Sequence, residues 1–441
     1  MIPVTVVLER NTRNAIIQIK GFLTSKVKLL FPIIFTAFLL RIAIALLGEH
    51  GDVVNYYWWA KDLWEKGLLG FYDRNIDNAM RPTYPPVTSY IFWLSVGLHQ
   101  LILKISWVLN IYIPIFPSNF ILWLESEKGW YFFNKLPAIF ADLGIIYFLY
   151  QIGKRLKNRK AGIVSALSFA FSPPFWYNSA LWGQTDSIYG FFILTSLLNL
   201  FQKKFIFATF LYALAILTKP TAFFAFPILI IGWLRSGRTL LKNVIIFLLL
   251  PIALYLPFHP QNLLPWILSF YQRSLGGELS YIVANAFNFW ALIFGFDNKP
   301  DTSLFLGIPV YAVGNTIFAV LALSIFLGMQ KRYNNQIVIL LTTIISFAAF
   351  LFLPRMHERY FYPTLLLLVS LVGLNKKYMW IFISLSLIHF INLYHFWWFP
   401  RWNFIVGILS NHIVEKFLVV LNIIFFLYLV VIFKQELKKI K

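Results

Sequence analysis

The chain has 441 residues, of which 59% are hydrophobic and only 12% are charged, and its mean hydropathy is +0.72. A soluble protein carries roughly twice that charged fraction, so the composition excludes a soluble globular protein and indicates an integral membrane protein. The net charge of +21 does not indicate nucleic-acid binding, because the basic residues form short clusters between apolar runs, as cytoplasmic loops do. The first of these clusters lies in residues 1–28, which have no cleavable signal-peptide pattern and which we expect to form a cytoplasmic leader.

Repeated apolar runs predict an all-α fold, in which residues 29–441 form one integral-membrane domain, a polytopic helical bundle. We expect about 12–14 transmembrane helices with both termini in the cytoplasm. The predicted spans are 29–48, 87–104, 106–124, 133–151, 161–178, 187–201, 204–218, 221–234, 243–258, 304–329, 336–353, 360–374, 378–398 and 412–433. The composition, rich in Phe, Ile and Lys and without cysteine, fits a prokaryotic plasma membrane.

The polar segment 49–86, between the first two predicted spans, carries six of the seventeen acidic residues. Its sequence GDVVNYYWWA places Tyr56, Trp59 and Leu63 at helical spacing, which predicts an amphipathic juxtamembrane helix in the headgroup layer. Asp52 at the start of this helix has two compatible interpretations, a helix N-cap or a catalytic carboxylate.

Three further polar motifs interrupt the apolar sequence. WGQTDS, residues 182–187, is a hydroxyl-rich turn beside a tryptophan, suited to hydrogen bonding and stacking on a sugar, although its Asp or Ser could simply cap the next helix. Lys219 in TKP divides an apolar stretch into two short helices, and either snorkels to the interface or meets a lipid phosphate, with Pro220 opening the next helix. Arg355 to Tyr360, RMHERY, either meets anionic lipid or clamps a phosphate, with Glu358 orienting one arginine.

The predicted topology places the segments 49–86, 178–187, 259–301 and 354–360 on the side away from the cytoplasm. A transporter concentrates its polar groups near the bilayer midplane, whereas an enzyme acting on a lipid-linked substrate gathers them at one interface. The distribution favours the enzyme, and a transporter or flippase for a lipid-linked sugar is the alternative. Within the predicted spans, Arg41 and Asp142 are expected to form a structural pair.

In order along the chain, the motifs GDVVNYYWWA, GLLGFYD, TYPP, NKLPAIFAD, WGQTDS, TKP, NAFNFWAL and MHERYFYP resemble the Gpi18-related branch of the GT-C glycosyltransferases. The resemblance covers residues 50–363, most of the chain. It implies a GT-C bundle with an extracytoplasmic active site and juxtamembrane helices in its first outer loop, 49–86. It also implies an inverting transfer of a sugar, typically mannose, from a polyprenyl or dolichyl phosphate to an acceptor hydroxyl.

Carried over to this sequence, the resemblance makes Asp52 the catalytic general base. Lys219, His357, Arg359 and Arg355 would bind the donor phosphate, and Tyr84, Trp182, Gln184 and Asp186 would shape the sugar and acceptor pocket. We expect no metal, because Val53 follows Asp52 where relatives often carry a second charged residue, and no other cofactor. The expected partners are the lipid-linked donor, a glycan, glycolipid or protein acceptor, and membrane lipids, with no nucleic acid.

Overall fold

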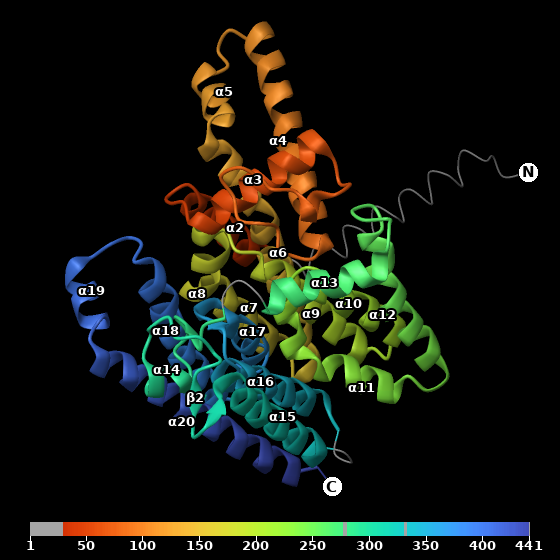
Figure 1. Cartoon of the computed structure of the whole chain (residues 1–441), viewed down its shortest axis with the longest axis vertical. Coiled ribbons are helices and arrows are strands. Elements are labelled where there is room, and N and C mark those ends of the chain that lie inside the picture. The colour runs from red at the N-terminus through yellow and green to blue at the C-terminus, as the bar shows by residue number, and fades with distance from the viewer. Residues whose placement is uncertain (1–29, 277–279, 330–332, 441) are drawn as a thin grey trace, which may run out of the picture.

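The computed structural model describes residues 30–276, 280–329 and 333–440, and the predicted leader 1–28 lies outside them. The described chain is mainly helical, with four strands of two residues each (Figure 1). Its first half contains α2 Leu30–Ala45, α3 Gly51–Lys66, η1 Phe71–Asp73, α4 Pro86–Tyr112, α5 Ser118–Glu125, α6 Glu127–Leu156, α7 Arg159–Phe171, α8 Pro173–Trp176, η2 Tyr177–Trp182, α9 Asp186–Phe201, α10 Phe205–Ile216 and η3 Pro220–Ala225. The second half contains α11 Pro227–Arg235, η4 Gly237–Thr239, α12 Leu240–Tyr255, α13 Leu263–Gly276, β1 Val283–Ala284, α14 Phe289–Phe294, β2 Leu304–Phe305, β3 Ile308–Pro309, α15 Val310–Met329, α16 Asn335–Phe352, β4 Met356–His357, η5 Glu358–Phe361, α17 Tyr362–Val369, α18 Lys376–Trp397, α19 Asn403–Leu409 and α20 His412–Lys438.

Among the described residues, seven helices are long and apolar enough to cross a membrane, namely α4, α6, α12 with η4, α15, α16, α18 and α20. Three shorter apolar helices, α2, α9 and α10, accompany them. The predicted helical membrane bundle is therefore confirmed, although several of its fourteen predicted spans are shorter than a full crossing. The sequence of α16 is apolar on all sides, and the helix is accordingly buried from Ile337 to Leu351 at the centre of the main core.

Of the two spans predicted at 87–104 and 106–124, the first lies within α4, which is long and apolar enough to cross a membrane, whereas the second is wrong. The structure has one continuous helix, α4, followed by the eight-residue helix α5, and the pair projects from the rest of the molecule (Figure 1). Helix α5 runs back along the second half of α4, so that Leu124 O lies 2.8 Å from His99 Nε2 and Trp107 donates to Glu125. Pro114 and Pro117 lie in the turn between the two helices, where the missing backbone N–H groups are tolerated. Because the start of α4 and the start of α6 both pack on α3, this hairpin leaves and rejoins the bundle at the same place.

The expected pair of Arg41 and Asp142 is present and fully buried. Arg41 Nε donates to Asp142 Oδ2 at 2.6 Å, and Ser179 and Ser187 donate to the same carboxylate at 2.6 and 2.5 Å. These four side chains join α2, α6, η2 and α9 beneath the segment that carries WGQTDS. A buried ion pair with every carboxylate oxygen hydrogen-bonded is the form in which a membrane bundle tolerates charge.

Candidate active site

Helix α3 begins with a capping arrangement that differs from the prediction. The N-cap is His50, whose Nδ1 accepts a hydrogen bond from the backbone N–H of Asp52 at 3.0 Å. Asp52 thus lies in the first turn of the helix and its carboxylate does not cap it, so the cap interpretation is wrong. A negative charge in a first turn is favourable because it faces the positive end of the helix dipole.

The Asp52 carboxylate is held by one oxygen. Oδ2 accepts from Trp182 Nε1 at 3.0 Å and from Gln184 Nε2, while none of the hydrogen bonds between described residues uses Oδ1. The side chain remains about a quarter exposed, at 27%. Burial raises the pKa of Asp52, but the charge of Arg359 and the Trp182 hydrogen bond oppose it, and the pKa lies below its ordinary value. Asp52 is therefore ionised at neutral pH with one oxygen free.

The donors to Asp52 are positioned by an irregular stretch of chain. Residues 177–182 form the π-helical turn η2, and Gly183 follows with φ +86°, a left-handed conformation that suits glycine. This turn directs Trp182 and Gln184 toward α3, and the side chains of both are fully buried. Asp186 begins α9 and does not cap it, since its carboxylate accepts from Lys219 Nζ at 2.7 Å and from Asn178 at 3.0 Å.

Lys219 lies in the break between α10 and η3, and Pro220 opens η3 as predicted. Its ammonium is buried, and besides Asp186 it donates to Gln184 Oε1 at 3.2 Å. Gln184 therefore bridges Lys219 and Asp52 and also accepts from Tyr56 OH at 3.1 Å. Tyr56 lies one helical turn beyond Asp52 and is bonded to Tyr84 OH at 2.9 Å.

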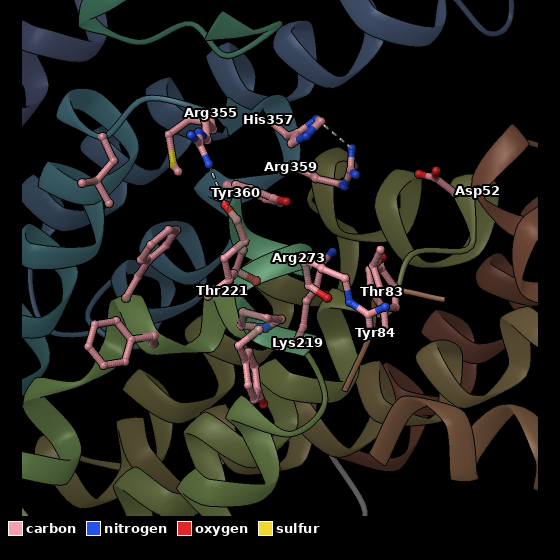
Figure 2. Close-up of a pocket in the computed structure, with 18 of the residues that line it drawn as sticks. Asp52, Thr83, Tyr84, Lys219, Thr221, Arg273, Arg355, His357, Arg359 and Tyr360 are labelled. Atoms are coloured by element: carbon pink, nitrogen blue, oxygen red, sulfur yellow. Dashed lines mark hydrogen bonds between the residues drawn. The ribbon is translucent and has the colours of Figure 1, made fainter. Parts of the chain in front are cut away.

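The segment from Arg355 to Tyr360 supplies the cations opposite Asp52. Arg359 extends toward Asp52 (Figure 2) and donates to the buried carboxylate of Glu358 at 2.8 Å, as predicted for Glu358. The Arg359 Nε atom is buried without a protein partner, so part of the guanidinium is available to a ligand. His357 is close to Arg359, and burial followed by the Arg359 charge lowers the pKa of His357 well below its ordinary value. Arg355 is engaged elsewhere, with Asp301 Oδ2 at 2.5 Å and the carbonyl of Leu275 at 2.8 Å.

These groups border one cavity of about 800 Å³. Its polar part contains Asp52, Tyr84, Lys219, His357, Arg359 and Tyr360 (Figure 2). Its apolar part comes from η3 and from the residues near the ends of α10 and α16, namely Ile216, Phe223, Phe224, Leu353 and Pro354. A cavity with one polar and one apolar part suits an amphipathic ligand better than a free sugar.

The predicted site residues divide into two groups. Asp52, Tyr84, Lys219, Arg355, His357 and Arg359 line the cavity, whereas Trp182, Gln184 and Asp186, predicted to shape the pocket, lie behind its wall and hold Asp52 and Lys219. The sequence did not single out His50, Thr221, Arg273 or Asp301, of which the last three line the cavity. The only sequence signal for His50 was its position two residues before Asp52, and the others come from segments that only the fold brings to the site. No group of three metal-ligating side chains occurs in the described chain.

Comparisons with known proteins concern the segment that contains Trp182 and Gln184, the hydrogen-bond donors to Asp52. Residues 126–261, just under a third of the chain, match the family model described as dolichyl-phosphate-mannose-protein mannosyltransferase. This segment resembles a mannosyltransferase. The match includes WGQTDS and Lys219, and it supports the GT-C resemblance at the level of the superfamily without reaching the Gpi18-related branch.

A comparison with solved structures also gave matches. ArnT from Cupriavidus metallidurans bound to undecaprenyl phosphate is 13% identical with a TM-score of 0.46, and the match covers 93% of this chain and 77% of that chain. The apo state of the same protein gives 13% identity, a TM-score of 0.47 and coverages of 92% and 76%. An oligosaccharyltransferase from Archaeoglobus fulgidus gives 10% identity, a TM-score of 0.37 and coverages of 91% and 56%. The comparison with curated proteins gave no match.

Proposed function

We propose that the chain is an integral-membrane glycosyltransferase that moves a sugar from a polyprenyl or dolichyl phosphate to an acceptor hydroxyl, with Asp52 as the general base. The observation that carries the proposal is the Asp52 carboxylate, fixed through one oxygen and free at the other, in the same cavity as the partly unpaired Arg359 guanidinium. The match of residues 126–261 to a family that uses dolichyl-phosphate mannose supports the lipid-linked donor.

The transfer requires one base and one group that stabilises the departing phosphate. The acceptor oxygen gives its proton to Asp52 Oδ1 and forms a bond to the anomeric carbon, while the bond from that carbon to the phosphate oxygen breaks and the phosphate keeps the electron pair. Attack opposite the leaving phosphate inverts the anomeric centre. A positioned base contributes about 10²–10⁴-fold, and a phosphate leaves without protonation by a second carboxylic acid.

The phosphate is assigned to Arg359 and His357. Arg359 retains an unpaired, buried N–H, and a guanidinium presents its donors to oxyanions in a fixed fork. Lys219 adds positive charge at the cavity wall, but its hydrogen bonds to Asp186 and Gln184 make it first a support for the Asp52 network. The apolar part of the cavity, next to the polar part, suits the first isoprene units of the donor.

Binding of the donor changes the pKa of the base, Asp52. The charge of Arg359 is the first of the influences that lower the pKa of Asp52, after the opposing effect of burial. An anionic phosphate on Arg359 offsets that charge, so the pKa of Asp52 rises in the complex. A carboxylate of higher pKa is a stronger base, so donor binding prepares Asp52 to accept the proton of the acceptor.

The finer assignments rest on the resemblance and on the family match. We assign mannose as the sugar because the matched family transfers it. The clusters of Lys and Arg between apolar helices favour an active site on the extracytoplasmic face, with both termini in the cytoplasm. The composition, rich in Phe, Ile and Lys and without cysteine, favours a prokaryotic plasma membrane.

The decisive experiment is transfer by purified Asp52→Asn with a panel of polyprenyl-phosphate sugars. The variant should lose about 10²–10⁴-fold in kcat and retain donor binding, because the amide keeps the shape of the carboxylate but cannot take a proton. Asp77→Asn is the matched control, since Asp77 is exposed in the same loop, and it should transfer at the wild-type rate.

Full transfer by Asp52→Asn would remove Asp52 from the role of base. A wild-type protein that moves lipid-linked sugar across a bilayer without transferring it to an acceptor would instead support the flippase.

A further inference from the structure

The motif NAFNFWAL, residues 285–292, has no role in the proposed chemistry, yet it borders the segment that carries the phosphate-binding cations. Its Trp290 is fully buried and donates from Nε1 to the carbonyl of Phe352 at 2.7 Å, at the end of α16. Phe352 lies three residues before Arg355 and seven before Arg359. The motif therefore fixes the point at which the chain leaves α16 for the site.

The residues before Trp290 hold the same segment farther along. The backbone N–H of Arg355 lies within 3.1–3.2 Å of the carbonyls of Tyr281 and Ile282. Strand β1 then pairs in parallel with β4, with Ala284 opposite His357, and Asn285 forms a further bridge to His357. Segment 281–290 is thus bonded to segment 352–357 at both ends and between them.

The opposite side of segment 281–290 is anchored to two long helices. Asn392 of α18 accepts from Phe287 N at 3.0 Å and donates to Asn285 O at 2.7 Å, and Asn422 of α20 donates to Phe287 O at 2.9 Å. His395 lies between Asn285 Oδ1, at 2.9 Å, and the buried Glu415 Oε1, at 3.0 Å. Amide groups that satisfy backbone donors and acceptors in a buried place specify one position for that backbone.

We propose that segment 281–290 is a positioning device that transmits the placement of α18 and α20 to His357 and Arg359, and so sets the geometry of the donor-phosphate clamp. In the turn 353–357, Arg355 has a left-handed conformation, φ +62°, which is strained for a residue other than glycine. The carbonyls of Tyr281 and Ile282 are the backbone partners that hold it in this conformation. This inference rests on the proposed function for the identity of the ligand, but its structural part does not. Trp290 and Asn285 act through the clamp and touch no reacting atom.

The first test uses Trp290→Phe, which keeps a buried aromatic ring and removes the indole donor to Phe352. Asn285→Gly is the second variant, because glycine accepts the φ of +60° at this position while losing the contact with His395. Trp233→Phe is the matched control, since Trp233 loses a comparable indole bond, to Thr209 at 3.2 Å, in α11, which contributes nothing to the cavity.

Two measurements separate positioning from general stability. Amide hydrogen exchange should be faster in residues 353–359 of both variants and unchanged in the control. The Kd for undecaprenyl phosphate and the KM for the donor should rise on the order of tenfold, with the KM for the acceptor unchanged and a smaller effect on kcat.

Wild-type exchange at 353–359 in both variants would overturn the inference, and so would faster exchange with unchanged affinity for undecaprenyl phosphate. Equal increases in donor and acceptor KM would likewise overturn it, since they indicate general disorder of the site. If the wild-type protein does not bind undecaprenyl phosphate, the proposed function is contradicted. Faster exchange confined to 353–359 in the variants would still support the placement of this segment by NAFNFWAL.

Discussion

At the scale of single residues, the decisive property of Asp52 is the asymmetry of its carboxylate. Trp182 and Gln184 both contact Oδ2, which leaves Oδ1 toward the cavity. His50 supports this arrangement from the other side, since it caps α3 through Nδ1 and packs against Trp182 with ring centroids 4.2 Å apart. Burial lowers the pKa of His50 to about 4, so this histidine is neutral at neutral pH and remains an acceptor for the helix N-terminus.

The pKa of Asp52 leads to a prediction about pH. In the free protein this pKa lies below its ordinary value, so Asp52 stays ionised until the solution is strongly acidic. Because a bound phosphate offsets Arg359, the pKa of Asp52 is higher in the donor complex, and activity there is lost at a higher pH as the solution is acidified. The acid limb of kcat, which reports the complex, should therefore lie above that of kcat/KM for the donor, which reports the free enzyme.

Steady-state rates measured across the acid range check this order. Coincident limbs, or a limb of kcat/KM that lies above that of kcat, would contradict the proposed effect of phosphate on Asp52. The pKa values of His50 and His357 in the free protein are both lowered by burial, so neither histidine should add a limb near 6.5, the ordinary value, to the profile of kcat/KM.

At the scale of elements, the site depends on buried polar contacts between helices that are distant in sequence. The Asp142 carboxylate receives Arg41 from α2, Ser179 from η2 and Ser187 from α9. Ser179 and Ser187 lie on either side of Trp182 and Gln184 in sequence. This cluster therefore secures the turn that holds Asp52, and a change in it should affect both stability and the site.

Arg41→Met should destabilise the protein by about 3–5 kcal/mol, because it leaves the buried Asp142 charge without its cation. The double variant Arg41→Met/Asp142→Leu should recover part of that loss, since it buries no unpaired charge. Reversible denaturant unfolding in detergent measures both, with the exposed Arg238→Met as control. A loss under about 1 kcal/mol in Arg41→Met, the size typical of a surface pair, would show that the pair is not structurally important.

At the scale of the whole molecule, the α4–α5 hairpin projects from the helical bundle and exposes apolar side chains. The second half of α4 is apolar yet exposed, and Ile115 in the turn after it is 92% exposed. Exposed apolar helices in a membrane protein contact lipid, because burial of an Ile or Leu side chain is worth about 1.5–3 kcal/mol. Trp107 in α4 and Trp123 in α5 are of the residue type that anchors helices at the membrane interface.

The hairpin should accordingly lie in the bilayer without spanning it. The chain has no cysteine, so Ile115→Cys and Leu101→Cys each provide a unique thiol. In lipid nanodiscs both should react with a charged, water-soluble maleimide at least about tenfold more slowly than Asn75→Cys in the exposed part of the 49–86 segment. Equal rates for Ile115→Cys and Asn75→Cys would place the tip of the hairpin in water.

The sequence by itself determined the membrane class, the helical fold and the segments in which polar chemistry gathers, because hydropathy, charge clusters and short polar motifs are local properties. It predicted α3, the opening of η3 by Pro220, the orientation of one arginine by Glu358, and the pair of Arg41 and Asp142. Only the tertiary structure decided that residues 86–125 form a hairpin, because two apolar helices have the same sequence pattern whether or not they cross a membrane.

The roles within the site were also decided by tertiary structure. Trp182, Gln184 and Asp186 have the composition of a sugar pocket, but their contacts with Asp52 and Lys219 place them behind its wall. The oxygen of Asp52 that remains free depends on hydrogen bonds from Trp182 and Gln184, which are more than a hundred positions away in the sequence. No local pattern encodes those contacts, because they exist only once the helices have packed.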